Sequence, residues 1–130
     1  MSMLTSPEHG VAFDLQRIAE ELRAEGAYAR EGHTARTLVH TPDLRIVVVV
    51  LKAGDTISEH HANVTASVQT VSGQIRLQLP DRAVELSVGH VLVLGAGLRH
   101  DVHAVLDSTF LLTLGPPANR TGRVGEGSNG

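Results

Sequence analysis

The chain has 130 residues, enough for one domain with a single hydrophobic core. Its composition, 42% hydrophobic and 19% charged, is that of a globular protein and argues against a disordered chain. A net charge of −3 and an aromatic content of 2% argue against nucleic acid as a partner, and the absence of cysteine excludes disulfides, thiolate metal sites and cysteine nucleophiles.

The N-terminal segment does not read as a signal peptide. Residues 1–10 lack the basic start and the apolar run of such a peptide, and we expect them to form a flexible N-terminus. The longest apolar stretch, Ile46 to Leu51, is too short to cross a bilayer. We therefore expect a cytoplasmic protein that does not interact with membranes.

One helix is predicted, over residues 11–26. Gly26 would be a natural C-terminal stop for this helix. Apolar residues recur there at helical spacing, with charged residues on the opposite face: Val11, Leu15, Ile18 and Leu22.

The chain then changes to a pattern of short strands, and residues 27–115 are predicted to form a β-barrel. The β-branched run from Leu44 to Leu51 has no polar alternation, which is typical of a strand buried on both faces. Residues 74–79 alternate instead, with every second side chain apolar. Further strands are predicted at 37–40, 83–87, 90–94 and 109–114.

Many short strands after a single helix indicate a mainly β domain, either a sandwich or a barrel. Pro116 and Pro117 end the last strand, and residues 116–130 are predicted to be a flexible C-terminal tail. No internal repeat and no linker divides the chain.

Two glycine-anchored segments give a more specific indication. Residues 54–73 read GDTISEHHANVTASVQTVSG, and residues 89–104 read GHVLVLGAGLRHDVHA. In this order they resemble the paired motifs of the cupin superfamily, with glycines at the expected intervals and with His60 and His100 at histidine positions of the motifs. Four of these glycines fall where sharp reversals favour positive φ: Gly54, Gly73, Gly89 and Gly97.

The resemblance implies a cupin-type double-stranded β-helix, a jelly-roll barrel, with one short N-terminal helix. In the family, two histidines and a glutamate of the first motif and a histidine of the second bind a divalent metal. Here Ala62 and Ala66 occupy the positions of the second histidine and the glutamate. On that mapping only His60 and His100 remain as metal ligands.

Two imidazoles without a carboxylate form an incomplete site for Zn, Fe, Ni, Mn or Cu, because protein sites usually supply three or four donors. The nearest candidates for extra donors are His61, Gln69 and His103. Alternation along an unbroken strand would turn His61 and Gln69 outward, whereas a β-bulge would bring one of them inside. The sequence therefore leaves open a weakly held metal or two imidazoles without one.

The two alanines should enlarge the inner cavity and make its wall apolar, which is the usual form of a small-molecule site. Two functions follow. The first is a stand-alone barrel that binds a small molecule, with or without a weakly held metal. The alternative is a metal-dependent cupin enzyme of the dioxygenase or isomerase type, so that catalysis stays undecided. The predicted pocket residues are His60, Ala62, Ala66, Val68, His100 and Phe110.

A homodimer is also predicted. The apolar strand Ile46–Leu51 and the apolar face of the helix at Val11–Leu22 offer more hydrophobic surface than so small a barrel should cover. Back-to-back pairing of two subunits, common in the family, would bury this surface.

Overall fold

The computed structural model describes residues 6–117, without the side chains of Glu59 and His60. The N-terminal part holds a 3-10 helix, η2 (Pro7–His9), and two α-helices, α1 (Leu15–Arg23) and α2 (Gly26–Glu31). Nine strands follow in these residues: β1 (His33–Thr41), β2 (Leu44–Leu51), β3 (Thr56–His60), β4 (Ala66–Ser72), β5 (Gln74–Gln78), β6 (Ala83–Ser87), β7 (Val91–Leu94), β8 (His100–Ala104) and β9 (Ser108–Leu114). Of the flexible termini predicted at 1–10 and 116–130, residues 1–5 and 118–130 lie outside the described residues, whereas Pro7–His9 form η2.

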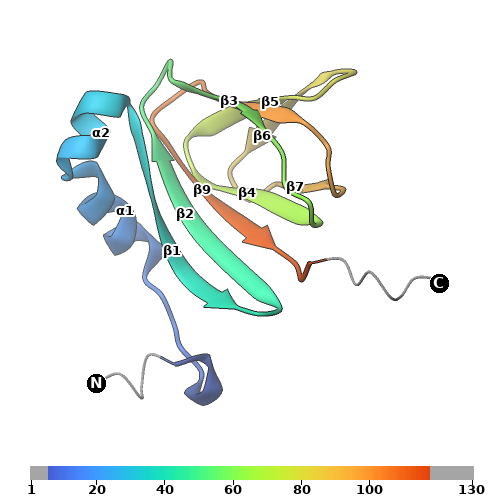
Figure 1. Cartoon of the computed structure of the whole chain (residues 1–130). Coiled ribbons are helices and arrows are strands. Elements are labelled where there is room, and N and C mark those ends of the chain that lie inside the picture. The colour runs from blue at the N-terminus through green and yellow to red at the C-terminus, as the bar shows by residue number, and fades with distance from the viewer. Residues whose placement is uncertain (1–5, 118–130) are drawn as a thin grey trace, which may run out of the picture.

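The strands form two antiparallel sheets that face each other (Figure 1). The larger sheet has the order β1-β2-β9-β4-β7, and the smaller one has the order β3-β8-β5-β6. Strands that are distant in sequence, such as β2 and β9, are neighbours in the large sheet. The prediction of a mainly β, two-sheet barrel is therefore confirmed.

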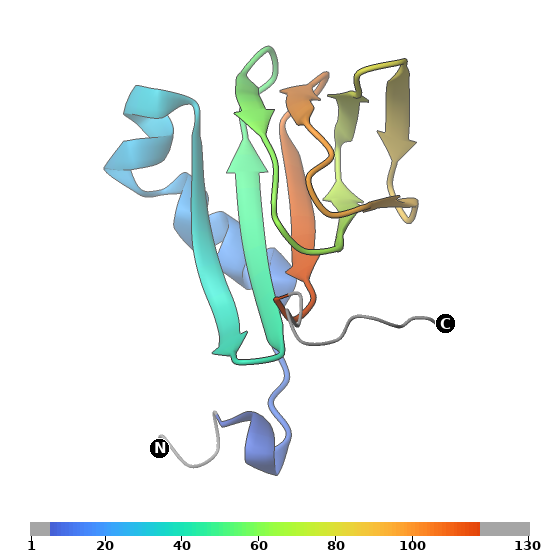
Figure 2. The ribbon, with the colours of Figure 1, turned by 45° about the vertical axis from the view of Figure 1, so that its right-hand side comes forward.

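Strand β2 is buried on both faces from Val47 to Leu51, as its apolar run predicted, whereas Leu44 and Arg45 at its start are exposed. Val49 and Leu51 belong to the core between the two sheets. Val48 and Val50 point the other way, into a second cluster with Leu22 of α1. Figure 2 shows the reason, because α1 lies across the outer face of the large sheet. Burying consecutive side chains from Val47 to Leu51 needs a layer on each side of the strand.

The helical region differs from the single helix predicted over residues 11–26. Helix α1 begins only at Leu15, because the Asp14 side chain caps it by accepting a hydrogen bond from the backbone N–H of Arg17 at 3.1 Å. Gly26 opens α2 instead of closing α1. Within residues 6–117, no helix has the length and apolar character that a membrane span requires.

The turns match the sequence more closely. All four glycines predicted to adopt positive φ do so: Gly54 at +88°, Gly73 at +84°, Gly89 at +86° and Gly97 at +82°. The alternating strand is also confirmed, because Ile75, Leu77 and Leu79 are all buried in the core between the sheets. These turns and this alternation fix which side chains face the space between the sheets.

Candidate functional site

A cavity of about 200 Å³ lies between the two sheets. Its wall contains five of the six residues predicted from sequence to line a pocket: Ala62, Ala66, Val68, His100 and Phe110. The other lining residues are Val49, Ile57, His61, Val102, Leu112 and Leu114. Apart from the two imidazoles, every described side chain of the wall is apolar.

Strand alternation places most of this wall. Ala66 and Val68 on β4 face inward, and Phe110 on the neighbouring strand β9 does the same. Gln69 follows Val68, lies on the opposite face of β4 and is exposed, so it does not face the cavity as an extra metal donor would have to. Because the residue at position 66 is an alanine, its small side chain leaves the space between the sheets open.

A bulge in β3 changes the position of the first-motif histidines. Ile57 pairs with Val102, and His60 pairs with His100, so three steps along β3 match two steps along β8. Strand β3 then ends at His60, and residues 61–65 leave the sheet. Strand alternation therefore does not determine the orientation of His61, which is exposed and lines the rim of the cavity. The outward orientation expected for an unbroken strand does not apply.

His60 and His100 come from distant parts of the sequence, and the fold makes them direct partners in the β3–β8 register. Cross-strand partners have Cα atoms about 5 Å apart. His100 is partly buried, and its Nδ1 lies 3.2 Å from the carbonyl oxygen of Leu98. Since a carbonyl oxygen can only accept a hydrogen bond, Nδ1 is the donor in this contact.

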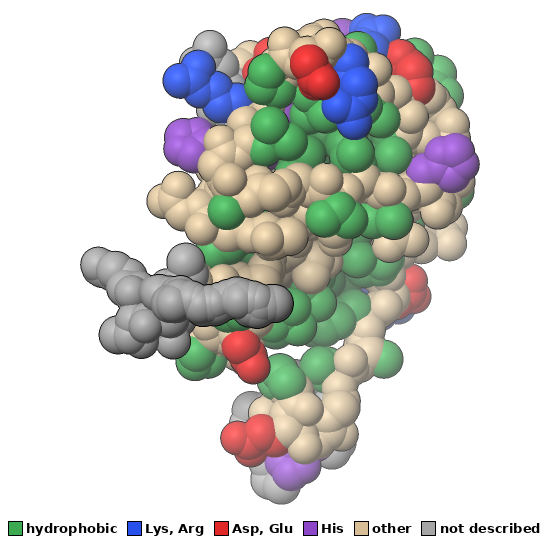
Figure 3. Space-filling model, turned by 90° about the vertical axis from the view of Figure 1, so that its right-hand side faces the viewer, with side chains coloured by type: hydrophobic (Ala, Val, Ile, Leu, Met, Phe, Trp, Pro, Cys, Tyr) green, Lys and Arg blue, Asp and Glu red, His purple; other side chains and the backbone are tan. Residues whose placement is uncertain are grey.

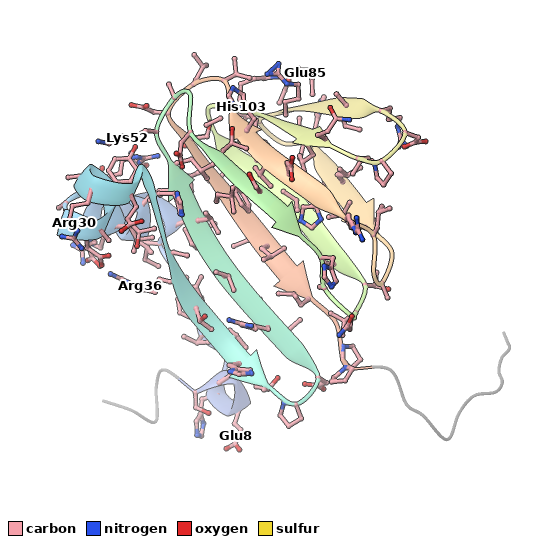
Figure 4. All side chains as sticks on the ribbon, turned by 45° about the horizontal axis from the view of Figure 1, so that its top comes forward. Glu8, Arg30, Arg36, Lys52, Glu85 and His103 are labelled. Carbon is pink, nitrogen blue, oxygen red and sulfur yellow. The ribbon has the colours of Figure 1, made fainter. Side chains whose placement is uncertain are left out.

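His103 lies outside the cavity, so the prediction of it as a donor is wrong. Its ring Nδ1 is hydrogen-bonded to the hydroxyl of Thr56 at 2.8 Å on the outer face of the small sheet. Figure 4 shows His103 close to Glu85 at the outer side of this sheet, away from the space between the sheets. Neighbouring residues in a strand point to opposite faces, so His103 points away from the side of Val102, which lines the cavity.

The described side chains of the wall do not by themselves form a tight divalent-metal site. The described side chains offer two imidazoles, His61 and His100, and none of them is a carboxylate. Among the described side chains of residues 6–117, which do not include those of Glu59 and His60, no three from histidine, cysteine, aspartate or glutamate group closely enough to hold a metal ion. A cation there would gain two donors and no compensating negative charge from these side chains, against the three or four donors of usual protein sites.

Sequence reasoning missed several apolar residues of the wall. Inward alternation along the strands predicted at 44–51 and 109–114 could have identified Val49, Leu112 and Leu114. Ile57 and Val102 could not be found in this way, because β3 and β8 were not predicted as separate strands. Their positions depend on the β3–β8 pairing.

Comparison with solved structures, and not with sequences, identifies the architecture. No protein-family model matches the sequence, and no curated protein shows significant similarity to it. A conserved protein of unknown function from Streptococcus pyogenes is 28% identical, with a TM-score of 0.68, over 85% of this chain and 91% of that one.

Two further solved structures are similar. KdgF from a Halomonas species is 25% identical, with a TM-score of 0.61, over 67% of this chain and 82% of that chain. An RmlC-like cupin with a double-stranded β-helix fold from Methanocaldococcus jannaschii is 19% identical, with a TM-score of 0.59. That match covers 66% of this chain and 82% of the other. The two facing sheets described above are therefore the two halves of such a β-helix.

Proposed function

Because this chain is a small cupin-fold domain, we propose that it binds a small organic molecule in the cavity between its two sheets. The observation that carries the proposal is the composition of the cavity wall. Among the described residues, nine apolar side chains surround the space, and His61 and His100 supply polar groups. Apolar walls with a few polar groups are typical of small-molecule sites.

The volume limits the size of the ligand. In another protein, an apolar cavity of about 150 Å³ stays dry and binds benzene. The cavity here, at about 200 Å³, has room for one ring or a chain of similar volume. Its polar end would meet the imidazoles of His61 and His100.

The donor set supports binding in preference to metal-dependent catalysis. Ala62 and Ala66 line the cavity at the motif positions where the family has a histidine and a glutamate. A metal held by the remaining imidazoles would be weakly bound. We expect far less than one equivalent of any transition metal in protein purified without a histidine tag, as measured by elemental analysis. A full equivalent of one metal would favour the enzyme alternative instead.

A cavity-filling variant tests the binding site. Leucine at position 66 should occupy the space that a ligand needs, since Ala66 is 5% exposed and lies in the wall. Phenol and toluene are suitable first probes, because each is a single ring. We expect them to raise the melting temperature of the wild type, since a ligand specific for the native state stabilises it.

The matched control is Gln69→Leu, which introduces a leucine on the outer face of the same strand. We expect Gln69→Leu to keep the shift in melting temperature and Ala66→Leu to lose it. Equal shifts in all three proteins, or no shift with any single-ring compound, would contradict the proposal. A wild-type preference for phenol over toluene that disappears in His100→Leu would assign the polar contact to His100.

A further inference from the structure

Arg23, the last residue of α1, is held against the outer face of the large sheet. Its Nη2 donates a hydrogen bond to Oγ1 of Thr109 on β9 at 2.7 Å. Thr109 is 1% exposed, so the acceptor is fixed within the packed structure. Arg23 takes part in none of the ion pairs formed within residues 6–117. One hydrogen bond uses one of the five N–H donors of a guanidinium group.

The remaining donors border a cleft of about 340 Å³ between α1 and the strands β4 and β9. Its apolar wall consists of Leu15, Ala19 and Val71. Gln16, Glu20 and Ser72 contribute polar side chains at its edges. This cleft is separated from the cavity between the sheets, because Thr109 faces α1 whereas Phe110 faces the interior.

We propose that this cleft is a second ligand site, which binds the carboxylate of a small monocarboxylic acid at Arg23. A guanidinium group positioned by a neighbour forms two parallel hydrogen bonds with a carboxylate, and such charge-assisted bonds are stronger than neutral ones. The Gln16 amide and the Ser72 hydroxyl supply further donors. The hydrocarbon part of the acid packs against Leu15, Ala19 and Val71.

Charge in the cleft gives the site a specific signature. The strands contribute no charged residue to its wall, and α1 contributes Arg23 and Glu20. Glu20 would repel a bound carboxylate, so neutralising Glu20 should strengthen binding. Arg17 lies on the same helix, is exposed, and is not part of the cleft wall. Arg17 is therefore a matched control for charge.

Arg23 also lies in the last turn of α1, where a positive charge stabilises the helix dipole. That role requires a charge but neither a planar donor pair nor a cleft. Arg23→Lys keeps the charge and loses the paired donors, so it separates the two roles. If Arg23 had only a structural role, neither the wild type nor any variant would bind a carboxylate in the cleft.

The experiment is a titration of the full chain with hexanoate, butyrate and 1-hexanol, followed by methyl NMR. Binding in the cleft should shift the methyl signals of Ala19, Val71 and Thr109, whereas binding between the sheets would shift those of Val68 and Val102. We expect hexanoate to bind more tightly than butyrate because it buries more hydrocarbon. The alcohol should bind the cleft at least about tenfold more weakly, since it lacks the charge.

Four variants complete the test. We expect Arg23→Gln and Arg23→Lys to weaken hexanoate binding in the cleft by about tenfold or more. Glu20→Gln should strengthen it, and Arg17→Gln should leave it nearly unchanged. The proposal is overturned if the cleft methyls do not respond to acid, if acid and alcohol bind equally, or if Arg17→Gln weakens binding as much as Arg23→Gln. The comparison of acid and alcohol uses the wild type, so it stands even if a variant fails to fold.

Discussion

At the scale of single residues, two glycines with the same backbone conformation have different surroundings. Gly73 and Gly54 both have positive φ, at +84° and +88°. A Cβ atom on Gly73 would collide with the Ser108 side chain and the Asp107 carbonyl oxygen, whereas a Cβ on Gly54 would meet no atom within 4 Å. Conformational strain is therefore shared by the two positions, and steric overlap is specific to Gly73.

We expect Gly54→Ala to lower the free energy of unfolding by about 1–2 kcal/mol, the cost of a left-handed residue with a Cβ. Gly73→Ala should cost at least about 2 kcal/mol more, because backbone of the β8–β9 turn must move. Urea unfolding of both variants measures the difference. Equal losses of unfolding free energy in the two variants would mean that the β8–β9 turn at Ser108 moves to accommodate the Cβ atom without destabilising the protein.

At the scale of elements, apolar contacts rather than ion pairs should hold α1 to the sheet. Leu22 is 1% exposed and packs with Val48 and Val50 of β2. Arg36 on β1 also contacts α1, with Nη1 2.8 Å from Oε1 of Glu21, and this hydrogen bond is the main cause that raises the pKa of Arg36. Both partners of that ion pair are substantially exposed, so its contribution to stability should be small.

Leu22→Ala is therefore expected to destabilise the domain by about 2–5 kcal/mol, through lost burial and a residual cavity. Leu106→Ala is the control, because Leu106 is 55% exposed and should change stability by no more than about 0.5 kcal/mol. Chemical unfolding followed by circular dichroism measures both. If the two variants lost the same stability, α1 would not be packed on the sheet in solution.

At the scale of the whole molecule, the surfaces that motivated a homodimer cover each other. The outer side chains of β2 are buried by α1 of the same chain, so neither the outer face of β2 nor the apolar face of α1 is left for a second subunit. Exposed apolar residues lie elsewhere, at Val91 and Val93, which are 56% and 63% exposed on β7. Strand β7 ends the large sheet, and edge strands readily pair with other chains. Figure 3 shows hydrophobic side chains gathered in the middle of one face, with charged side chains at its ends.

The homodimer stays a prediction, now placed at β7. Light scattering at micromolar concentration should give the mass of two chains for the wild type. Val93→Glu should give the mass of one chain, because it would place a charge in the buried interface. Leu106→Glu, at an exposed position outside β7, should stay dimeric. A wild-type mass of one chain contradicts the prediction.

The sequence by itself determined the features that depend on local geometry. The positive φ of Gly54 or Gly89 follows from turn chemistry, and the double burial of β2 follows from its unbroken apolar run. The motif spacing was enough to place Ala62, Ala66 and His100 in one interior wall. Each of these depends on neighbours within a few residues or on a repeated spacing.

Only the tertiary structure decided the features that depend on pairing between distant strands. The bulge opposite β8 and the end of β3 at His60 bring His61 to the cavity rim. No local sequence pattern predicts the bulge or the position at which the strand ends. Likewise, Arg23 meets Thr109 only because α1 packs across the large sheet. Register and packing are set by the whole chain at once, so the residues that complete each site are found only after folding.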